Sequence, residues 1–217
     1  IRTHHHSNRN VKSRHIITLL DGSQNAAQAL PMAQWICETI GAQLTFVAAS
    51  RNFLAGSAER AAIEAYLSSV AEKLHAAGIK VNSVISADPP AEATHRLVTE
   101  KEVDLVIVTT AGSSGGKNWL SGGLSSKLVH LLDIPVLLVQ VFESGPAEAS
   151  HLGRILVALD GSAFAEQILP YARLLGKQFD CELMLICVPA VPESEKYRAP
   201  ASVIRAIRKQ AEVNMRK

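Results

Sequence analysis

The stretch that decides the fold is "VDLVIVTTAGSSGGKNWLSGGLSSKLVHLLDIPVLLVQV", residues 103–141. It begins with an apolar, β-branched run, which is typical of a strand buried on both faces of a parallel sheet. Residues 106–128 then contain five glycines and five serines. Leucines at helical spacing follow, and "IPVLLVQV" indicates a further strand. A strand, a loop, a helix and a strand in this order predict parallel strands joined by a crossover helix.

The same alternation extends toward the N-terminus. Apolar runs over residues 14–20, 42–50 and 79–86 predict three more strands, each bounded by turn residues. Helical spacing connects them: one helix runs from Ala26 to Ile40 and stops at Gly41, a second centres on Leu67, and a third opens at Pro90. The sequence therefore predicts an α/β fold in which a five-stranded parallel sheet has helices on both faces.

The opening segment recurs later in the chain. "RILVALDGSAFAEQILP", from residue 154, copies "HIITLLDGSQNAAQALP", from residue 15. Asp160 therefore aligns with Asp21, and we call the step from Asp21 to Asp160 the repeat offset. This repeat predicts a polar leader over 1–13, a first domain over 14–142, a linker over 143–152 and a partial second domain over 153–217. The second copy holds a strand, a helix, a strand and one more helix. Either the natural protein is longer than this sequence, or the half unit leans on the first domain or on another chain.

Composition excludes several classes of protein. The 217 residues are 47% hydrophobic and 19% charged with a net charge of +2, which is ordinary for a globular protein and gives no sign of nucleic-acid binding. No apolar run approaches the roughly 18 residues of a membrane span, and the N-terminus lacks the apolar core of a signal peptide. A cytoplasmic protein without membrane partners is expected. Cys37, Cys181 and Cys187 lie among apolar neighbours without metal-ligand spacing, so we expect buried small hydrophobes.

Three of these features together resemble the universal stress protein family in its two-domain form: the strand that ends in "DGS", the glycine loop after the fourth strand, and the tandem repeat. ATP-binding members carry G-x2-G-x9-G-[ST] in that loop. Gly112, Gly115 and Ser126 match this pattern, whereas Ser125 stands in place of the third glycine. Ser114 occupies a position where such members often have histidine. The resemblance implies the fold of the adenine nucleotide alpha hydrolases, with strand order 3-2-1-4-5.

The resemblance also implies an adenine nucleotide, ATP or AMP, bound with or without Mg2+. Physical reasoning agrees, because ligands of open parallel sheets bind beyond the carboxyl ends of the strands, and glycine turns and helix N-termini attract phosphates. The end of the first strand would lie near the adenine and ribose, and the loop near the phosphates. The implied nucleotide-binding residues are Leu20, Asp21, Val47, Ala48, Ala111, Gly112, Ser114, Gly115, Ser125 and Ser126.

Two positions leave alternatives open. If Ser125 needs a positive φ, the phosphate loop is misshapen; if it starts a helix with ordinary angles, its N–H serves as well as that of glycine. Asp21 ends a strand before a turn, where a carboxylate commonly accepts backbone N–H groups without any ligand. Asp160 is a weaker candidate for ligand binding than Asp21, because its half of the chain lacks the glycine loop.

Catalytic motifs have little support. "AGSSGGKN", residues 111–118, fits the P-loop pattern G-x4-G-K-[ST] at only two of four fixed positions, because Ala111 and Asn118 replace the first glycine and the metal-binding hydroxyl. The first strand-to-helix turn lacks G-x-G-x-x-G, which disfavours a dinucleotide enzyme. We expect no dedicated catalytic residues and, at most, slow ATP hydrolysis.

Two functions remain. The first is a nucleotide-binding stress-response or signalling protein. The alternative is an interaction module of the same fold that binds no nucleotide. The resemblance implies that the module would pair through its fifth strand, Ile134–Val141, whose apolar edge needs a partner. A tandem chain could instead satisfy that edge internally, as a pseudo-dimer with its second unit.

Overall fold

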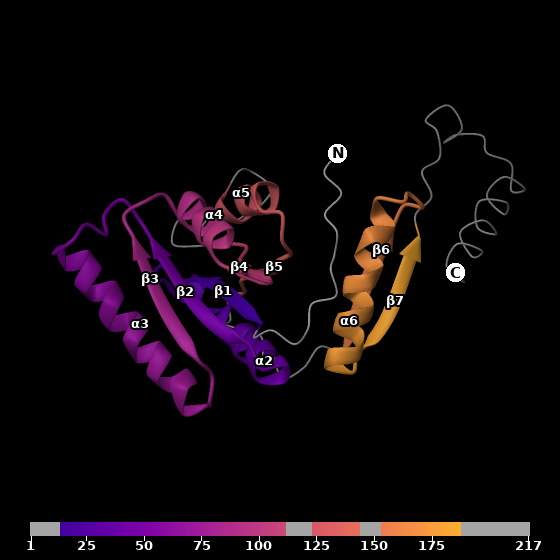
Figure 1. Ribbon diagram of the computed structural model, residues 1–217, viewed down its shortest axis with the longest axis horizontal. Helices are drawn as coiled ribbons and strands as arrows, with labels where there is room; N and C mark the ends of the chain where they lie inside the picture. Colours follow the sequence, from indigo (N-terminus) through magenta and orange to yellow (C-terminus); the bar gives the residue numbers. More distant parts are fainter. Residues whose placement is uncertain (1–13, 112–122, 144–152, 188–217) are drawn as a thin grey trace, which may run out of the picture. The chain divides into compact units, whose positions relative to one another are not determined.

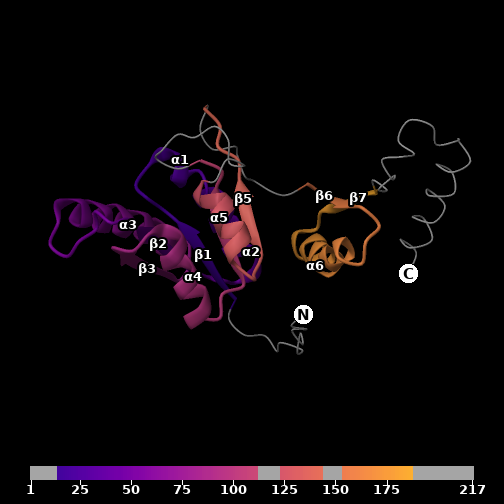
Figure 2. The same cartoon turned by 90° about the horizontal axis from the view of Figure 1, so that it is seen from above.

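The computed structural model describes residues 14–111, 123–143 and 153–187. The chain divides into two units, Ile1–Ser150 and His151–Lys217. The first unit contains a parallel sheet of five strands in the order β3-β2-β1-β4-β5, and Figure 2 shows β3 and β5 at its opposite edges. The predicted fold class and strand order are confirmed. The strands are β1 (His15–Leu19), β2 (Gln43–Ala49), β3 (Val81–Ser86), β4 (Leu105–Thr109) and β5 (Val136–Val139).

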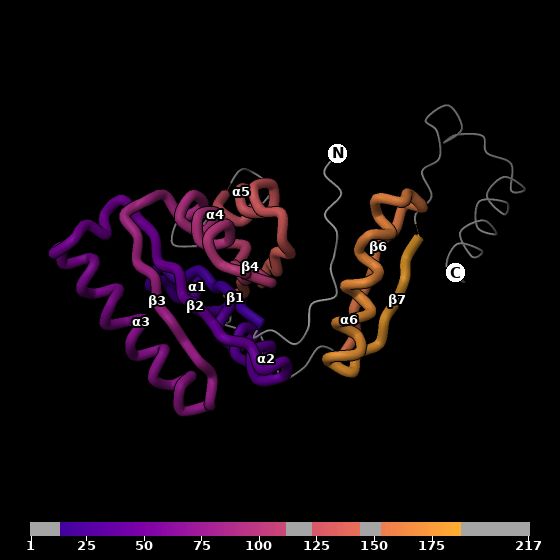
Figure 3. Tube along the Cα trace, in the orientation of Figure 1, coloured from indigo at the N-terminus to yellow at the C-terminus, as the bar shows by residue number. Residues whose placement is uncertain are grey.

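Helices cover both faces of this sheet. Figure 1 shows α2 and α3 on one side and α4 and α5 on the other. The change of side occurs where the chain returns from the β3 edge through α4 to the centre of the sheet, a path that can be followed in Figure 3. The helices are α1 (Gln24–Ala27), α2 (Leu30–Ile40), α3 (Ala58–Ala76), α4 (Pro90–Glu100) and α5 (Leu124–Leu131).

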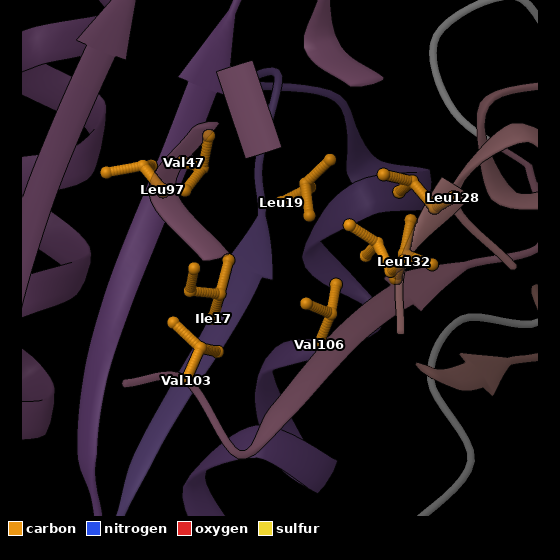
Figure 4. Close-up of a cluster of buried hydrophobic side chains, with 9 residues drawn as sticks. Ile17, Leu19, Val47, Leu97, Val103, Val106, Leu128 and Leu132 are labelled. Atoms are coloured by element: carbon orange, nitrogen blue, oxygen red, sulfur yellow. The ribbon is translucent and has the colours of Figure 1, made fainter. Parts of the chain in front are cut away.

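The main core lies between the sheet and the α4–α5 layer (Figure 4). Ile17 of β1 and Val106 of β4 have no exposed surface, and Leu97 of α4 and Leu128 of α5 close over them. Alternate residues of a strand face opposite sides of the sheet, so Ile16, also buried, faces the α2–α3 side. Because β1 is buried on both faces, its run of apolar residues is continuous rather than alternating.

The prediction of one helix from Ala26 to Ile40 is wrong in one respect, because the structure has two helices, α1 and α2, in this segment. The amide of Gln28 donates to Asn25 O and that of Ala29 to Ala26 O, so α1 closes with two tight turns before α2 begins. Pro31 stands in the first turn of α2. Proline lacks an amide hydrogen and clashes with a preceding helical carbonyl, so it is tolerated at the start of a helix and not inside one.

The second unit repeats the beginning of the first. Its strands β6 (Arg154–Leu159) and β7 (Glu182–Cys187) are parallel, and η2 (Ala165–Ile168) and α6 (Leu169–Phe179) connect them. Arg154 is paired with Glu182 in register, as His15 is paired with Gln43, so the repeat offset holds in both strands. The predicted leader over 1–13 and the predicted last helix lie outside the described residues.

The cysteines differ from the prediction that all three are buried. Cys37 in α2 is buried, and burial raises the pKa of its thiol to about 12, so it is a packing residue. Cys181 and Cys187 flank or end β7 and are partly exposed, because the described part of the second unit has only two strands to bury them. Across the described residues, no helix combines the length and apolar character that crossing a membrane requires.

His15 occupies a buried position at the start of β1. Its Nε2 lies 2.8 Å from Thr45 Oγ1 of β2, and its backbone amide donates to Asp104 Oδ2 at 3.0 Å. Burial, with a further contribution from the charge of Lys101, lowers the pKa of the imidazole; Asp104 and the backbone at Glu102 oppose this shift by less. A protonated His15 is therefore less stable in the folded chain than in the unfolded one.

We expect His15→Gln to flatten the pH dependence of stability in acid. Above the unfolded pKa of about 6.5, His15 is neutral in both states; as the pH falls below that value, only the unfolded chain gains the proton readily, and the free energy of unfolding declines. One such group contributes at most about 1.4 kcal/mol per pH unit. Urea unfolding between pH 7.5 and 5 measures the slopes, and His95→Gln, on the exposed side of α4, is the control. Equal slopes for wild type and His15→Gln would contradict the prediction.

Candidate functional site

The carboxyl ends of β1 and β2 meet at one edge of the sheet. The amide of Leu20 donates to Val47 O at 3.0 Å, which continues the pairing of the two strands by one residue. Leu20 and Val47 each expose 1% of their surface, and Ala48 exposes none. All three predicted site residues are therefore buried at the strand ends, with Val47 and Ala48 on opposite faces of the sheet. We call them the apolar floor of the site, and none of them offers a charged group to a ligand.

Asp21, Gly22 and Ser23 form a tight turn above this floor. Asp21 Oδ1 accepts the amide of Ser23 at 3.0 Å, and Ser23 Oγ accepts the amide of Ala26 at 3.1 Å, capping α1 as predicted. Gly22 has φ +81°, a left-handed conformation that favours glycine. The carboxylate of Asp21 thus has the structural role that a strand-ending aspartate can have, while the residue itself is exposed at the rim of the site.

The second unit contains the same turn. Ser162 donates its amide to Asp160 Oδ1 at 2.9 Å, Ser162 Oγ accepts from Ala165 at 3.0 Å, and Gly161 has φ +83°. Hydrogen bonds to Ser162 lower the pKa of Asp160. The turn therefore recurs in a unit whose described residues contain no counterpart of the glycine loop.

The end of β4 leads into the glycine loop. Thr109 Oγ1 donates to Ala111 O at 2.8 Å, so the last described residue of this connection is held against the strand end. Ala111 itself is half-buried. The predicted loop residues Gly112, Ser114 and Gly115 lie outside the described residues. The structure thus describes the two ends of the loop.

The far end of the loop enters α5 with ordinary helical geometry. Gly123 is the N-cap, with φ −66° and ψ 176°, and the first intrahelical hydrogen bond runs from Lys127 N to Gly123 O at 3.1 Å. Among described residues other than glycine, only Asp180 has a positive φ. Ser125 therefore needs no left-handed backbone, and of the two alternatives for this position the helical one is correct. Its side chain is 3% exposed, and Ser126 is half-buried.

Strand order brings these parts to one edge of the sheet. β1 lies between β2 and β4, so the chain leaves β1 toward one side and β4 toward the other. Asp21 and Ala111 follow neighbouring strands, and α5 begins where the connection from β4 ends. The amides of Leu124, Ser125 and Ser126 precede the first intrahelical bond, and such amides carry partial positive charge. This edge combines an apolar floor, a carboxylate and the start of a helix.

Tyr66 of α3 belongs to this edge, although no motif in the sequence singles it out. Burial raises the pKa of its phenol, and the negative charge of Asp21 raises it further, so the two side chains are electrostatic neighbours. A Cβ atom on Gly22 would lie 3.5 Å from Ile63 Cδ1, which shows that α3 passes over the turn. The helical spacing of Ile63 and Leu67 predicted the helix, but its position beside the turn after β1 depends on the crossover from β2.

Gln28 is a second residue that sequence reasoning missed. Its side-chain amide donates to Phe142 O at 2.9 Å and accepts from Phe142 N at 3.0 Å, which fastens the chain after β5 to the break between α1 and α2. Thr110 Oγ1 accepts the amide of Val141 at 3.3 Å beside it. The sequence does contain a signal for this position, because a glutamine recurs at Gln167, one repeat offset after Gln28. Gln167 is exposed.

The loop sequence also fits the motif of hydrolase nucleophiles. Residues 112–116 read Gly-Ser-Ser-Gly-Gly, a match to the G-x-S-x-G pattern of α/β-hydrolases. In those enzymes the serine lies in a sharp turn that leads directly from a strand into a helix. Here β4 ends at Thr109 and α5 begins at Leu124, and residues 112–116 lie between them, outside the described residues. The match therefore rests on the sequence alone.

Metal ligands do not gather in the part of the chain that the structure describes. It contains no group of three or more His, Cys, Asp or Glu side chains that could hold a metal ion. Asp88 and Arg96, beyond the end of β3, form an ion pair of 2.6 Å between Oδ2 and Nη1. The negative charge of Asp88 is therefore paired with Arg96.

Comparison with known proteins agrees with this geometry. The model of the universal stress protein family matches residues 12–140, which include β1 to β5 and the whole glycine loop. The chain belongs to the universal stress protein family. No curated protein matches the sequence.

Solved structures show the same fold. A universal stress protein from Archaeoglobus fulgidus is 22% identical, with 90% of this chain and 73% of that chain covered and a TM-score of 0.61. A putative universal stress protein from Pseudomonas aeruginosa is 19% identical, with 93% and 68% covered and a TM-score of 0.68. UspA from Lactobacillus plantarum is 18% identical and covers 60% of this chain and 99% of its own, with a TM-score of 0.52. At these identities the likeness concerns the fold.

We predict that restoring the family glycine at position 125 destabilises the protein slightly. Ser125 has helical angles, so Ser125→Gly gains no relief of strain and adds backbone freedom to the unfolded chain, lowering the free energy of unfolding by about 0.5 kcal/mol. Chemical denaturation measures the change. Gly22→Ala is the comparison, because Gly22 has a left-handed backbone. This variant should lower the free energy of unfolding by about 1–2 kcal/mol. A Ser125→Gly variant more stable than wild type would contradict the helical assignment.

Proposed function

We propose that this universal stress protein binds an adenine nucleotide, ATP or AMP, at the edge formed by the carboxyl ends of β1, β2 and β4 and the start of α5. The observation that carries the proposal is the helical backbone at Ser125. The one departure from the family's glycine pattern leaves the first amides of α5 available, because their positions precede the first intrahelical bond. Phosphates bind well at such a helix start.

The described residues suggest a role for each part of the site. The purine base would lie against the end of β2 at Val47 and Ala48, whose side chains are themselves buried. Asp21, exposed beside Tyr66, is a hydrogen-bond acceptor for the ribose hydroxyls. The amides of Ser125 and Ser126 would donate to phosphate oxygens, together with the loop residues Gly112, Ser114 and Gly115 that the family resemblance implies.

The proposal does not require a separate protein site for Mg2+. The cation usually keeps several waters and is held through substrate phosphates with one or two carboxylates. With no cluster of three ligands among the described residues, Mg2+ would arrive on the nucleotide, and Asp21 is the one carboxylate among the proposed site residues. Binding, and not hydrolysis, is the activity proposed, with occupancy controlling how the chain associates. The cytoplasmic location expected from the sequence stays a prediction.

Calorimetric titration with ATP, AMP and cyclic AMP, with and without Mg2+, tests this function. We expect saturable binding that Asp21→Ala weakens about tenfold, the equivalent of about 1.4 kcal/mol. The chain itself offers a matched control, because Asp160 makes the same turn with a 2.9 Å bond to Ser162. Asp160→Ala removes the same turn contact from the second unit and should leave the affinity unchanged.

Two results would refute the nucleotide proposal. One is the absence of binding at millimolar nucleotide by a chain whose circular dichroism shows that it is folded. The other is an equal loss of affinity in Asp21→Ala and Asp160→Ala, which would assign the effect to general damage of the turns.

We also propose that the chain is the tandem form, with a first domain over 14–142, a linker over 143–152 and a partial second domain over 153–217. Support comes from the second unit, which repeats the register of β1 and β2 and each bond of the DGS turn at the repeat offset. The Archaeoglobus and Pseudomonas structures align with 90% and 93% of this chain, beyond the region matched by the family model.

A second candidate function is association through β5 without nucleotide. β5 has β4 as its one neighbour in the described sheet, and all four of its residues are half-buried apolar side chains. Such an edge offers main-chain groups and apolar surface to another strand. In this alternative the segment Ile134–Val141 pairs with a second copy or, as a pseudo-dimer, with the second unit.

Leu137→Lys tests that edge. A lysine in an edge strand disfavours pairing with another strand, so we expect the weight-average mass in sedimentation equilibrium to fall toward that of the monomer. The control is Leu54→Lys, since Leu54 is 60% exposed outside the sheet. An unchanged mass for Leu137→Lys would exclude β5 as the contact.

A further inference from the structure

Tyr66 lies at the margin of the buried stripe of α3, close to the candidate site. Ile63 and Leu67 belong to that stripe, with 5% and 1% of their surface exposed. Tyr66 follows Ile63 by one helical turn and is half-buried. A Cβ atom on Gly22 would lie 3.5 Å from Ile63 Cδ1. This part of α3 therefore lies beside the DGS turn, which is the turn that carries Asp21.

Helix geometry brings the Tyr66 side chain toward this turn. Long side chains of an α-helix lean toward its N-terminus and cover the preceding turn of the helix. For Tyr66, the preceding turn contains Ile63, the residue beside Gly22. Tyrosine combines an apolar ring with a polar tip, which agrees with its half-buried position. The geometry therefore places the phenol on the side of α3 where Asp21 is exposed.

The electrostatics of the two side chains agree with this placement. Burial raises the pKa of Tyr66, and the Asp21 carboxylate raises it further through its charge rather than through a hydrogen bond. Tyr66 is therefore a protonated donor at neutral pH, and its proton is not held by Asp21. Asp21 is an acceptor, since its Oδ1 receives the amide of Ser23 at 3.0 Å. A hydrogen-bond donor and an acceptor thus lie near each other at the rim of the site.

A neutral hydroxyl group fits this pair better than a phosphate does. The carboxylate of Asp21 repels a phosphate, and Arg60, a cation on the same helix, is paired with Glu64 at 3.0 Å. A hydroxyl both donates and accepts hydrogen bonds, so it can bind to a carboxylate and to a protonated phenol. Two adjacent hydroxyls, as in the diol of ribose, match one donor and one acceptor that lie near each other.

We propose that Tyr66 is a specificity-determining residue of the nucleotide site and acts with Asp21 to select a ribose that carries its diol. This inference rests on the nucleotide binding proposed above. Tyr66 Oη donates to one ribose hydroxyl, and the other ribose hydroxyl donates to the Asp21 carboxylate. A site built to hydrogen-bond a hydroxyl rejects the analogue that lacks it, because its polar groups then lose their partners.

Calorimetric titration with ATP and with dideoxy-ATP, which lacks both ribose hydroxyls, tests this selection. We expect the wild-type chain to bind ATP at least about tenfold more tightly than dideoxy-ATP. Tyr66→Phe removes only the phenol hydroxyl, so it should weaken ATP binding about fivefold and leave the affinity for dideoxy-ATP unchanged. Tyr171→Phe is the matched control, because Tyr171 is a partly exposed tyrosine, 39% exposed, on α6 of the second unit. Its ratio of the two affinities should equal that of wild type.

Two results would overturn the role of Tyr66 while leaving nucleotide binding in place. One is equal affinity of the wild-type chain for ATP and dideoxy-ATP, a result that needs no variant. The other is an affinity ratio in Tyr66→Phe equal to that of wild type; if both affinities fall together, the residue supports the structure of the site without contacting the ribose. The absence of binding of either compound to the folded wild-type chain would refute the proposed function and this inference together.

Discussion

The pairing of β1 on both edges, under apolar layers on both faces, is the constraint on which the first unit depends. Ile16 and Ile17 face opposite sides of the sheet and are both buried, so both faces of β1 are shielded from solvent. Thr18, in the middle of the strand, has a buried hydroxyl group. This hydroxyl has a hydrogen-bond partner within the sheet, because Thr18 Oγ1 donates to Ile107 O of β4 at 3.2 Å. β1 could not be an edge strand without exposing all of these groups.

The site follows from that constraint. Because β1 must be central, the chain has to leave it toward β2 and return later as β4 on its other side, and the carboxyl ends of β1 and β4 come to lie next to each other. In the sequence, the glycine loop follows β4 at this junction. Asp21 and the start of α5 are therefore brought to one edge by the burial of apolar side chains far below them, before any ligand takes part.

The sequence predicted most of the fold because its signals are local. Gly41 ends α2 with φ 64°, Ser23 caps α1, and apolar runs mark the strands. The sequence did not predict features that depend on two separate segments: the electrostatic proximity of Tyr66 to Asp21 and the hydrogen bonds of Gln28 with Phe142 arise only after the crossovers are in place. The predicted loop residues Gly112, Ser114 and Gly115 lie outside the described residues, so these three of the ten predicted site residues rest on motif and family.

Ser125 shows how a family pattern and a backbone argument can differ. A glycine at this position suggests a left-handed turn, and its replacement suggests a damaged loop. The helix start at Gly123 removes that reason, because position 125 already lies within the first turn of α5 and any residue can adopt its angles. What a glycine there still offers is the absence of a side chain, and Ser125 compensates by lying buried, 3% exposed, rather than projecting from the rim. The requirement at this position is thus for a small residue that fits a buried place in the first turn of a helix, and serine meets it.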